Sequence, residues 1–570
     1  MMNDHPAPAR RVVVMGDVGW PHLYHVGDEA MTQVAIDRLT ADGVVDVTVV
    51  AADPEVAARL HGVAAVPRFH FKLGWPREWH DSHLEKVLAP LAGFQRRTGP
   101  AQTVLDAVHD ADAVVIAGGG NMTSQYVHQL YERLALVRVA RHFGRPVFVT
   151  SQTLGATFRE VDLPVMTEII DSAAVFGARE GTSATLARSM AADAGRVFTT
   201  GDDALLLPRA PLDDEVDGLP ERYLVASFER PPGLDDERAR AHADRVGRAL
   251  EAVSQALDCA VVFVPHAGSL DVETPKDDVV SHAAIAVAVS RPVLLPVLPA
   301  GQTLAVTSRA LVSLSTRYHP VVFAAAAGVP ALGFADTAYT WQRMVGATSQ
   351  YGLARTVLPG TVLDDPTVLA GLVSSLVDEW PHVTEGVNSA VRAVQQGQSD
   401  WWRALGCALR GEPFVFKPMD PPAQVPLGAT EAVLADAAPV LGVDSGRERE
   451  AHRWTTERLE AVAAERSDLE LRLGRESRER RTVEQQLGEA RELVEHTRSE
   501  AAALRRELAE EQRATADLTA DLAAEGERLS AEKARWRAAA LGYRREVQRY
   551  RDRRITRISD ALARAFRRPS

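Results

Sequence analysis

Cysteine and uninterrupted apolar runs are both scarce in this sequence. Its 570 residues include only two cysteines, Cys259 and Cys407, too few for a disulfide framework or a cysteine-based zinc site. We therefore expect a reducing, cytoplasmic compartment. The N-terminal residues do not join a basic segment to an apolar one, and an arginine and two prolines interrupt the most apolar stretch, residues 283–300. We accordingly expect neither a signal peptide nor a membrane span.

Positive charge is not in excess either. The chain has 64 lysines and arginines against 77 aspartates and glutamates, a net charge of -13, which argues against a nucleic-acid partner. The sequence also has no dense run of carboxylates or histidines that would demand a metal ion. We predict no metal site and no cofactor. The length exceeds what one hydrophobic core usually supports and suggests three or four structural units.

Short apolar runs that end in glycine or polar residues recur along the chain. Strands are predicted at residues 11–15, 46–51, 113–117, 146–150 and 174–176, and again at 223–228, 260–265, 293–298, 311–314 and 331–334. Helical patterns alternate with them, and a break rich in proline and acid separates the two sets. We predict an α/β fold with Rossmann-like domains at residues 1–208 and 221–412, with ligands at the carboxyl ends of the strands.

The stretch from Ala310 to Gly333 predicts a strand, a short loop and a helix. Arg317 and His319 lie between the strand and the alanine-rich helix that Pro320 opens, because proline suits a first helical turn. Helix N–H groups and a guanidinium favour an anion, and a histidine can move a proton near neutral pH. The alternative is that both residues only cap and pack, which their position at a strand end disfavours.

The C-terminal part of the chain has a different character. A helical run over residues 366–409, with Trp380, Trp401 and Trp402, is expected to pack across the two domains. Residues 413–446, rich in proline and alanine, predict a linker. Apolar residues at heptad spacing over residues 447–534 then predict an α-helical coiled coil and a homo-oligomer, with a lone solvated helix as the alternative.

Residues 535–570 form a basic tail. It contains twelve arginines against three acidic residues, with apolar side chains interleaved. We expect an anionic surface at the inner face of the membrane or an acidic groove on another protein as the partner; nucleic acid could satisfy the same charges, but we predict no nucleic-acid partner.

Five short motifs in a fixed order resemble those of the polysaccharide pyruvyl transferase family, over residues 12–345. They are Gly27-Asp28-Glu29-Ala30, Gly118-Gly119-Gly120, Ser151-Gln152-Thr153-Leu154-Gly155, Arg179-Glu180-Gly181-Thr182-Ser183 and Arg317-Tyr318-His319. The resemblance implies a glycosyltransferase-B-like pair of Rossmann-like domains with the site in the cleft between them. It also implies phosphoenolpyruvate as the donor substrate and a glycan or lipid-linked sugar as the acceptor.

The roles of the candidate residues follow from this reaction. Enolpyruvate becomes electrophilic when its methylene carbon is protonated, so we assign His319 as general acid and Arg317 to the phosphate or carboxylate. Asp28 or Glu29 would bind or deprotonate the acceptor hydroxyls. Arg343 is the nearest base after the last strand, where family members often carry a tyrosine followed by a lysine. The remaining candidates for substrate binding are Gly118, Gly119, Gly120, Asn121, Ser151, Gln152, Arg179 and His266.

Two other functions fit the same fold, because a fold does not determine a reaction. One is a nucleotide-sugar glycosyltransferase or epimerase. The other is a non-catalytic scaffold that assembles glycan enzymes through its coiled coil, which retention of Arg317, His319 and the three glycines disfavours.

Overall fold

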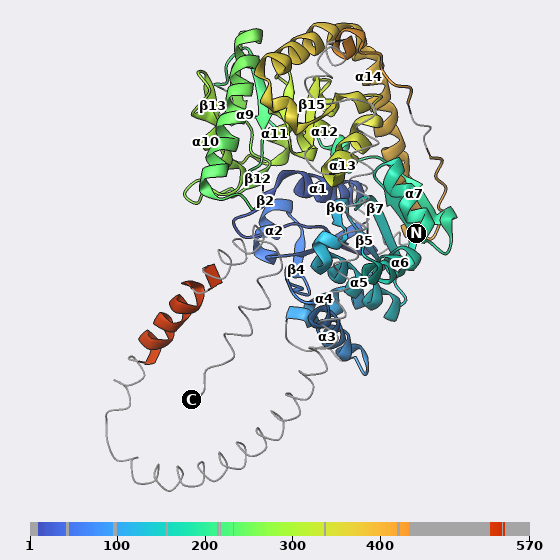
Figure 1. Ribbon diagram of the computed structural model, residues 1–570. Coiled ribbons are helices and arrows are strands. Elements are labelled where there is room, and N and C mark those ends of the chain that lie inside the picture. Colours follow the sequence, from blue (N-terminus) through green and yellow to red (C-terminus); the bar gives the residue numbers. More distant parts are fainter. Residues whose placement is uncertain are drawn as a thin grey trace, which may run out of the picture. The chain divides into compact units, whose positions relative to one another are not determined.

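The computed structural model of the 570-residue chain separates into two units, Met1–Val443 and Asp444–Ser570 (Figure 1). We call the first unit the head. The structure describes residues 10–41, 45–94, 100–155, 158–213, 216, 218–231, 233–335, 338–418, 422–432, 525–538 and 540–541. In the second unit the described residues are helical. Most of the predicted coiled coil at 447–534 and most of the tail at 535–570 lie outside the described residues.

The first half of the head is built on a parallel sheet. Its strands are β1 (Arg10–Met15), β3 (Val45–Ala51), β4 (Ala64–Pro67), β5 (Ala113–Ile116), β6 (Gly119–Met122), β7 (Val147–Leu154), β8 (Ala173–Ala178) and β9 (Val197–Thr199). They run in the order β4-β3-β1-β5-β7-β8-β9, and β6 also pairs with β7. Continuous apolar runs such as Val12-Val13-Val14 are buried on both faces, as parallel strands between helices require.

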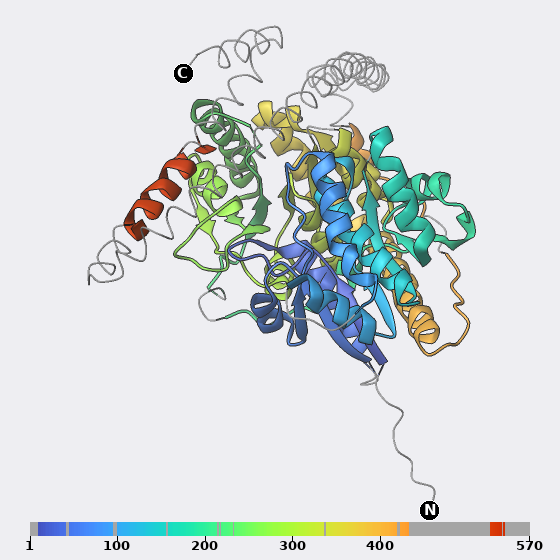
Figure 2. The same cartoon turned by 90° about the horizontal axis from the view of Figure 1, so that it is seen from below.

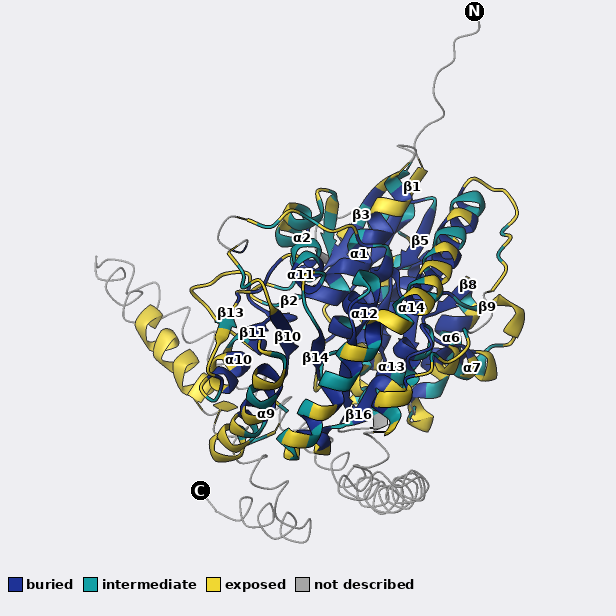
Figure 3. Cartoon of the chain, turned by 90° about the horizontal axis from the view of Figure 1, so that it is seen from above, coloured by how far each residue is buried: buried dark blue, intermediate teal, exposed yellow. Residues whose placement is uncertain are grey.

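Helices follow these strands along the chain. They are α1 (Val26–Thr40), α2 (Pro54–His61), α3 (Arg77–Leu88), α4 (Pro100–Asp110), α5 (Val127–His142), α6 (Leu163–Ser172) and α7 (Gly181–Met190). The strands are largely buried, and exposed residues concentrate on the outer sides of the helices (Figure 3).

The second half of the head has its own six-stranded parallel sheet, in the order β13-β11-β10-β14-β15-β16. These strands are β10 (Tyr223–Ser227), β11 (Ala260–Phe263), β13 (Pro292–Leu294), β14 (Ser313–Ser315), β15 (Ala331–Ala335) and β16 (Val357–Pro359). Its helices are α9 (Asp236–Leu257), α10 (Asp278–Ala286), α11 (Ala300–Thr307), α12 (Tyr318–Ala327) and α13 (Ala338–Ser349). The prediction of an α/β fold with parallel sheets is therefore confirmed.

A small antiparallel ladder joins the two halves. The segment β2 (Tyr24–His25) follows β1, and β12 (Ala267–Gly268) follows β11; the two pair with each other. The Val26 amide also donates to the His266 carbonyl at 3.0 Å. Because both segments follow the carboxyl end of a parallel strand, those ends of the two sheets face one another. This is the edge at which open α/β sheets bind ligands.

The long helix α14 (Pro366–Leu409) packs on both halves, as its tryptophans predicted (Figure 2). Near its start, the Trp380 indole donates to the Gly328 carbonyl of the second half at 2.8 Å. Near its end, Trp401 donates to Thr150 of the first half at 3.1 Å and Trp402 donates to Asp203 at 2.8 Å. The helix thus connects the two domains through buried side chains.

Three segments differ from the sequence-based interpretation. The loop expected at Ser151–Gly155 continues β7 as far as Leu154, and the glycines predicted as a strand end form the extra strand β6. Ser151 has a positive φ of 51°, and the β6–β7 register shifts, so a bulge carries the strand past the expected turn. The described part of the predicted linker packs on the head: Phe414 and Phe416 contact Trp401, and the Val425 amide donates to the Gly352 carbonyl.

Within the described residues, no helix is both long enough and apolar enough to cross a membrane.

Candidate active site

Arg317 lies where the sequence placed it, between a strand end and a helix start, whereas His319 is the second residue of the helix, which begins two residues before Pro320. Strand β14 ends at Ser315, Arg317 has the extended backbone of an N-cap, and α12 begins at Tyr318. Gly328 closes the helix in a left-handed conformation, with φ of 73°, which glycine adopts without strain.

The imidazole of His319 is held between the two domains. It lies so close to Gly27 of α1 that a Cβ on Gly27 would overlap the ring. Its Nε2 is 4.0 Å from Asp202 Oδ2, and Nε2 has no hydrogen-bond partner among the described residues. Burial, together with the charges of Arg179 and Arg343, holds the pKa of His319 well below its usual range. The lowered pKa favours the neutral side chain near pH 7.

Two guanidinium groups from different domains contact the same ring. Arg179, which follows β8, is fully buried, and Arg343 belongs to α13; their Cζ atoms lie 4.8 Å and 5.1 Å from the centre of the Tyr318 ring. Arg179 Nε forms an ion pair with Asp202 at 3.2 Å. Arg179 Nη1 and Arg343 Nε have no hydrogen-bond partner within the described chain. Two cations with unused N–H donors beside His319 form a site suited to an anion.

Within the triple glycine, Gly120 lets side chains of the second domain approach the backbone of the first. Arg343 Nη2 lies 2.5 Å from where a Cβ on Gly120 would stand. The Tyr339 hydroxyl donates to the Gly120 carbonyl at 2.5 Å, and Arg343 Nη1 donates to that hydroxyl at 3.1 Å. Gly118 is equally crowded, by Met31 and Ser151. Gly120 therefore permits close approach from the second domain, whereas Gly118 permits close packing within the first.

Arg317 is occupied by carboxylates of its own domain. Its Nη2 donates to Asp278 at 2.6 Å and its Nη1 pairs with Glu229 at 2.9 Å. The second oxygen of Asp278 accepts from the amides of His266 and Ala267 at 3.0 Å. Despite burial, Asp278 and Glu229 raise the pKa of Arg317. This network orders the loops around the site.

His266 lies in the same region. Its Nδ1 is 3.2 Å from Ser227 Oγ and 3.1 Å from the Val264 carbonyl, while Nε2 lacks a partner in the described residues. Burial lowers its pKa to about 4, so the ring is neutral.

The two acids of the N-terminal motif have different environments. Glu29 is buried, and its oxygens accept from the Gly19 amide at 3.0 Å and contact His61 Nε2 at 2.8 Å. Asp28 makes no side-chain hydrogen bond or ion pair to another described residue. Burial and the nearby charge of Asp17 raise the pKa of Asp28 to about 6.

Asp17 is a site residue that sequence reasoning missed. Its Oδ1 accepts from Trp20, Gln129 and Arg68 at 2.9, 2.9 and 3.2 Å, and its Oδ2 accepts from Asn121 at 2.9 Å. Burial alone would raise its pKa, but the charges of Arg68 and Arg133 lower it to about 2. Its position directly after β1, in Gly16-Asp17, was the available signal.

The remaining predicted residues surround β6. Ser151 is used structurally, since its hydroxyl donates to the Gly201 carbonyl at 2.8 Å and accepts from the Asp203 amide at 2.9 Å. Gln152 donates to the Ala117 carbonyl, which leaves Oε1 without a partner in the described chain. Asn121 Oδ1 is likewise buried and unpartnered there, and both oxygens are close to Gly119. They are available to accept hydrogen bonds from a ligand.

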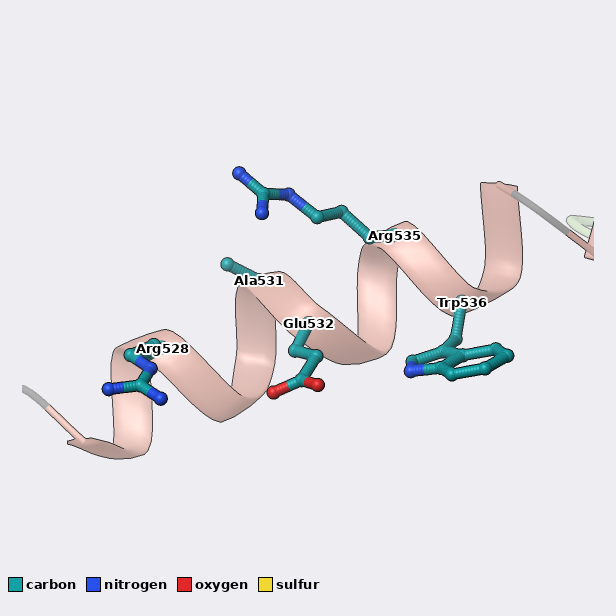
Figure 4. A pocket seen from close by; sticks show the side chains of 5 residues that line it. All are labelled: Arg528, Ala531, Glu532, Arg535 and Trp536. Atoms are coloured by element: carbon teal, nitrogen blue, oxygen red, sulfur yellow. The ribbon is translucent and has the colours of Figure 1, made fainter. Parts of the chain in front are cut away.

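A metal-binding cluster and the hollow on the C-terminal helix are the alternatives to this site. Among the described residues, no group of three or more histidines, cysteines or acids could hold a metal ion. In the described part of the chain, the hollow beside Arg528, Arg535 and Trp536 is lined by a single helix (Figure 4). The side chains between the two sheets of the head are therefore the candidate active site.

A model of the polysaccharide pyruvyl transferase family matches residues 25–337, which is more than half of the chain. A search of curated proteins finds no match to the sequence.

Three solved structures illustrate what the chain is similar to. MnaA from S. aureus, in a co-structure with UDP, has 10% identity and a TM-score of 0.49, covering 72% of this chain and all of its own. A UDP-GlcNAc 2-epimerase from Neisseria meningitidis, bound to UDP-GlcNAc, has 13% identity and a TM-score of 0.44; the match covers 68% of this chain and 98% of the epimerase. MurG from Acinetobacter baumannii has 17% identity and a TM-score of 0.38; the match covers 70% of this chain and 99% of MurG.

Proposed function

Because the chain belongs to the polysaccharide pyruvyl transferase family, we propose that it moves the enolpyruvyl group of phosphoenolpyruvate onto two hydroxyls of a glycan sugar. The product is a pyruvate ketal. The observation that carries this proposal is the pair of guanidinium groups at His319, each with an N–H that has no partner in the described residues. Phosphoenolpyruvate has a carboxylate and a phosphate on the same carbon, and such a pair of cations can hold both.

Arg179 and Arg343 are our choice for the donor anions. They reach His319 from different domains, and both contact Tyr318. Arg317, which the sequence suggested for this role, already pairs with Asp278 and Glu229. We assign Arg317 to ordering the loops that carry His319 and His266. Arg317→Lys would still disrupt the site, because lysine lacks the planar fork that bridges two carboxylates.

His319 becomes an acid only when the donor is bound. Burial and the charges of Arg179 and Arg343 keep its pKa low. A bound phosphate and carboxylate would neutralise these cations and raise that pKa. The protonated ring can then deliver its proton to the methylene carbon of phosphoenolpyruvate, leaving a cationic carbon that an acceptor hydroxyl can attack.

The test is turnover by the purified full-length chain. Phosphoenolpyruvate should raise its melting temperature, and inorganic phosphate should be released only when a glycan acceptor is added. His319→Ala should lower this release by about a hundred- to ten-thousand-fold without loss of the fold. Arg196→Lys, at an exposed ion pair with Asp193, is the matched surface control. Stabilisation by a nucleotide sugar and not by phosphoenolpyruvate would contradict the proposal.

A further inference from the structure

Two carboxylates of the first domain lie beside the candidate site. Asp17 follows β1, and Asp28 lies in the first turn of α1, next to the glycine against which His319 packs. Asp17 accepts four hydrogen bonds, while Asp28 accepts none from another described residue. The structure thus holds one carboxylate ionised and leaves the other available for proton transfer.

Asn121 provides an independent indication that a hydroxyl-bearing ligand binds here. Its side chain is 8% exposed, and its Nδ2 donates to Asp17 at 2.9 Å. Only the NH₂ end of the amide can donate to a carboxylate, so Asp17 determines which way the amide points. Oδ1 is left buried and without a partner in the described chain. A buried carbonyl oxygen of this kind favours a ligand that donates a hydrogen bond, as a sugar hydroxyl does.

We propose that Asp28 takes the proton from the attacking hydroxyl of the sugar acceptor, and that Asp17 is the positioning residue that orients Asn121 toward the same sugar. This inference rests on the proposed pyruvyl transfer. It also separates two acids that the sequence left equivalent, because Glu29 is held by Gly19 and His61 and cannot reach a substrate without breaking those contacts.

The proton and bond changes balance. As the hydroxyl oxygen bonds to the central carbon of protonated enolpyruvate, its O–H bond breaks and the proton moves to Asp28. A second hydroxyl then replaces phosphate at the same carbon, with cleavage of the carbon–oxygen bond to phosphate. Of the two hydroxyl protons released, one replaces the proton given to the methyl group and the other leaves with phosphate. No oxidant or reductant is needed.

The surroundings of Asp28 suit a base that works near neutral pH. Burial and Asp17 raise its pKa to about 6, against the opposing charges of His25, Arg179 and Arg343. A base must be ionised, so turnover should fall as pH drops through the pKa of Asp28. The titratable and charged groups that act on Asp28 come from five elements or their adjoining loops: Asp17, His25, Arg133, Arg179 and Arg343.

The experiment compares Asp28→Asn with Glu29→Gln in the full-length protein. Asp28→Asn should still be stabilised by phosphoenolpyruvate, while kcat/KM for the acceptor falls by about a hundred- to ten-thousand-fold. It should also lose the acid limb of the pH profile near pH 6 and keep the alkaline limb. Glu29→Gln should lower the melting temperature and keep both limbs, because it breaks a structural contact. Asp17→Asn should raise KM for the acceptor more than it changes kcat.

Two results would overturn the inference while leaving the proposed function intact. One is an Asp28→Asn enzyme that turns over at the wild-type rate, and the other is an unchanged acid limb in that variant. Failure of the proposed function looks different, because the wild-type protein would then release no phosphate from phosphoenolpyruvate at any pH. An NMR titration of ¹³C-labelled aspartates needs no turnover. Absence of a carboxyl that titrates near pH 6 and disappears in Asp28→Asn would also contradict the assignment.

Discussion

At the residue scale, the site is governed by which ionisable groups have partners and which do not. His319 lies against Gly27 and close to two arginines. Burial and the charges of these arginines lower its pKa well below the usual value, which favours the neutral ring at neutral pH. Phosphoenolpyruvate would reverse that situation by bringing negative charge to Arg179 and Arg343. Binding of the donor and protonation of His319 should therefore be coupled.

This coupling makes a prediction about proton uptake. When phosphoenolpyruvate binds near pH 7, the protein should take up a proton at His319. A group whose pKa rises on binding gains protons at any pH between its pKa in the free protein and its pKa in the complex. Isothermal titration calorimetry in buffers of different ionisation enthalpy measures this directly. His319→Gln should bind the donor with no such uptake, and Arg196→Lys should behave as the wild type. Equal observed enthalpies in all buffers for the wild type would contradict the coupling.

Residue-level reasoning from sequence placed some side chains well and missed others. Arg317 was predicted at a strand end and lies there, whereas His319 lies in the first turn of α12, which begins before the proline. That Arg317 is paired could not be predicted, since Asp278 and Glu229 reach it from distant loops. Asp17 was missed because a lone acid in a glycine loop resembles a turn residue, and its four donors come from separate segments.

At the element scale, the glycines of β6 allow α13 to approach the first domain. The guanidinium of Arg343 occupies the space where a side chain at Gly120 would stand, and Tyr339 donates to the same backbone. Gly119 differs, because the nearest atoms to a Cβ there are Asn121 Oδ1 at 3.4 Å and Gln152 Oε1 at 3.5 Å. Neighbouring glycines of one strand therefore offer a matched pair of substitutions.

Gly120→Ala should weaken the donor site. Its Cβ would displace the Arg343 guanidinium, and loss of a charged hydrogen bond typically costs about 1.5–3 kcal/mol, or roughly tenfold to a hundredfold in affinity. Gly119→Ala should cost much less, because its Cβ meets ordinary contact distances. Thermal shift measured over a range of phosphoenolpyruvate concentrations compares the two variants. Equal donor affinity in Gly120→Ala and the wild type would remove Arg343 from the donor site.

The elements themselves were largely predictable, and their extensions were not. Buried parallel strands appear as apolar runs in the sequence, so β1, β3, β5 and β8 were found nearly to their ends. Strand β6 was not, because its two glycines have low strand propensity, and pairing with β7 holds them extended. The same tertiary pairing carried β7 past Ser151, where the local sequence predicted a loop.

At the scale of the whole molecule, the head is connected by contacts far apart in sequence. Helix α14 hydrogen-bonds to both domains through its tryptophans, and residues 413–418 and 422–432 pack back onto the head. These contacts end before the boundary between the two units at Val443. A separate cooperative head is therefore expected, with the heptad repeat setting how many heads associate.

The basic tail stays a prediction about location. Of its residues, the structure describes 535–538 and 540–541, which are helical, and Trp536 is 70% exposed. Each basic residue near an anionic leaflet contributes about 1 kcal/mol. We propose that the tail brings the head to lipid-linked acceptors at the membrane surface, with an acidic protein partner as the alternative. With either partner, we expect the heptad repeat that precedes the tail, and not the tail itself, to determine the oligomeric state.

Truncation separates these contributions. A chain that ends at Val443 should unfold cooperatively and keep its stabilisation by phosphoenolpyruvate, because the described contacts of the head lie before that residue. It should have the mass of a monomer in light scattering, since the heptad surface predicted for the coiled coil is gone. A chain that ends at residue 534 keeps the heptads and loses the tail, so it should have the same mass multiple as the full-length protein. A head that keeps this multiple when it ends at Val443 would show that the coiled coil does not assemble the protein, and the interface would then have to lie on the head itself.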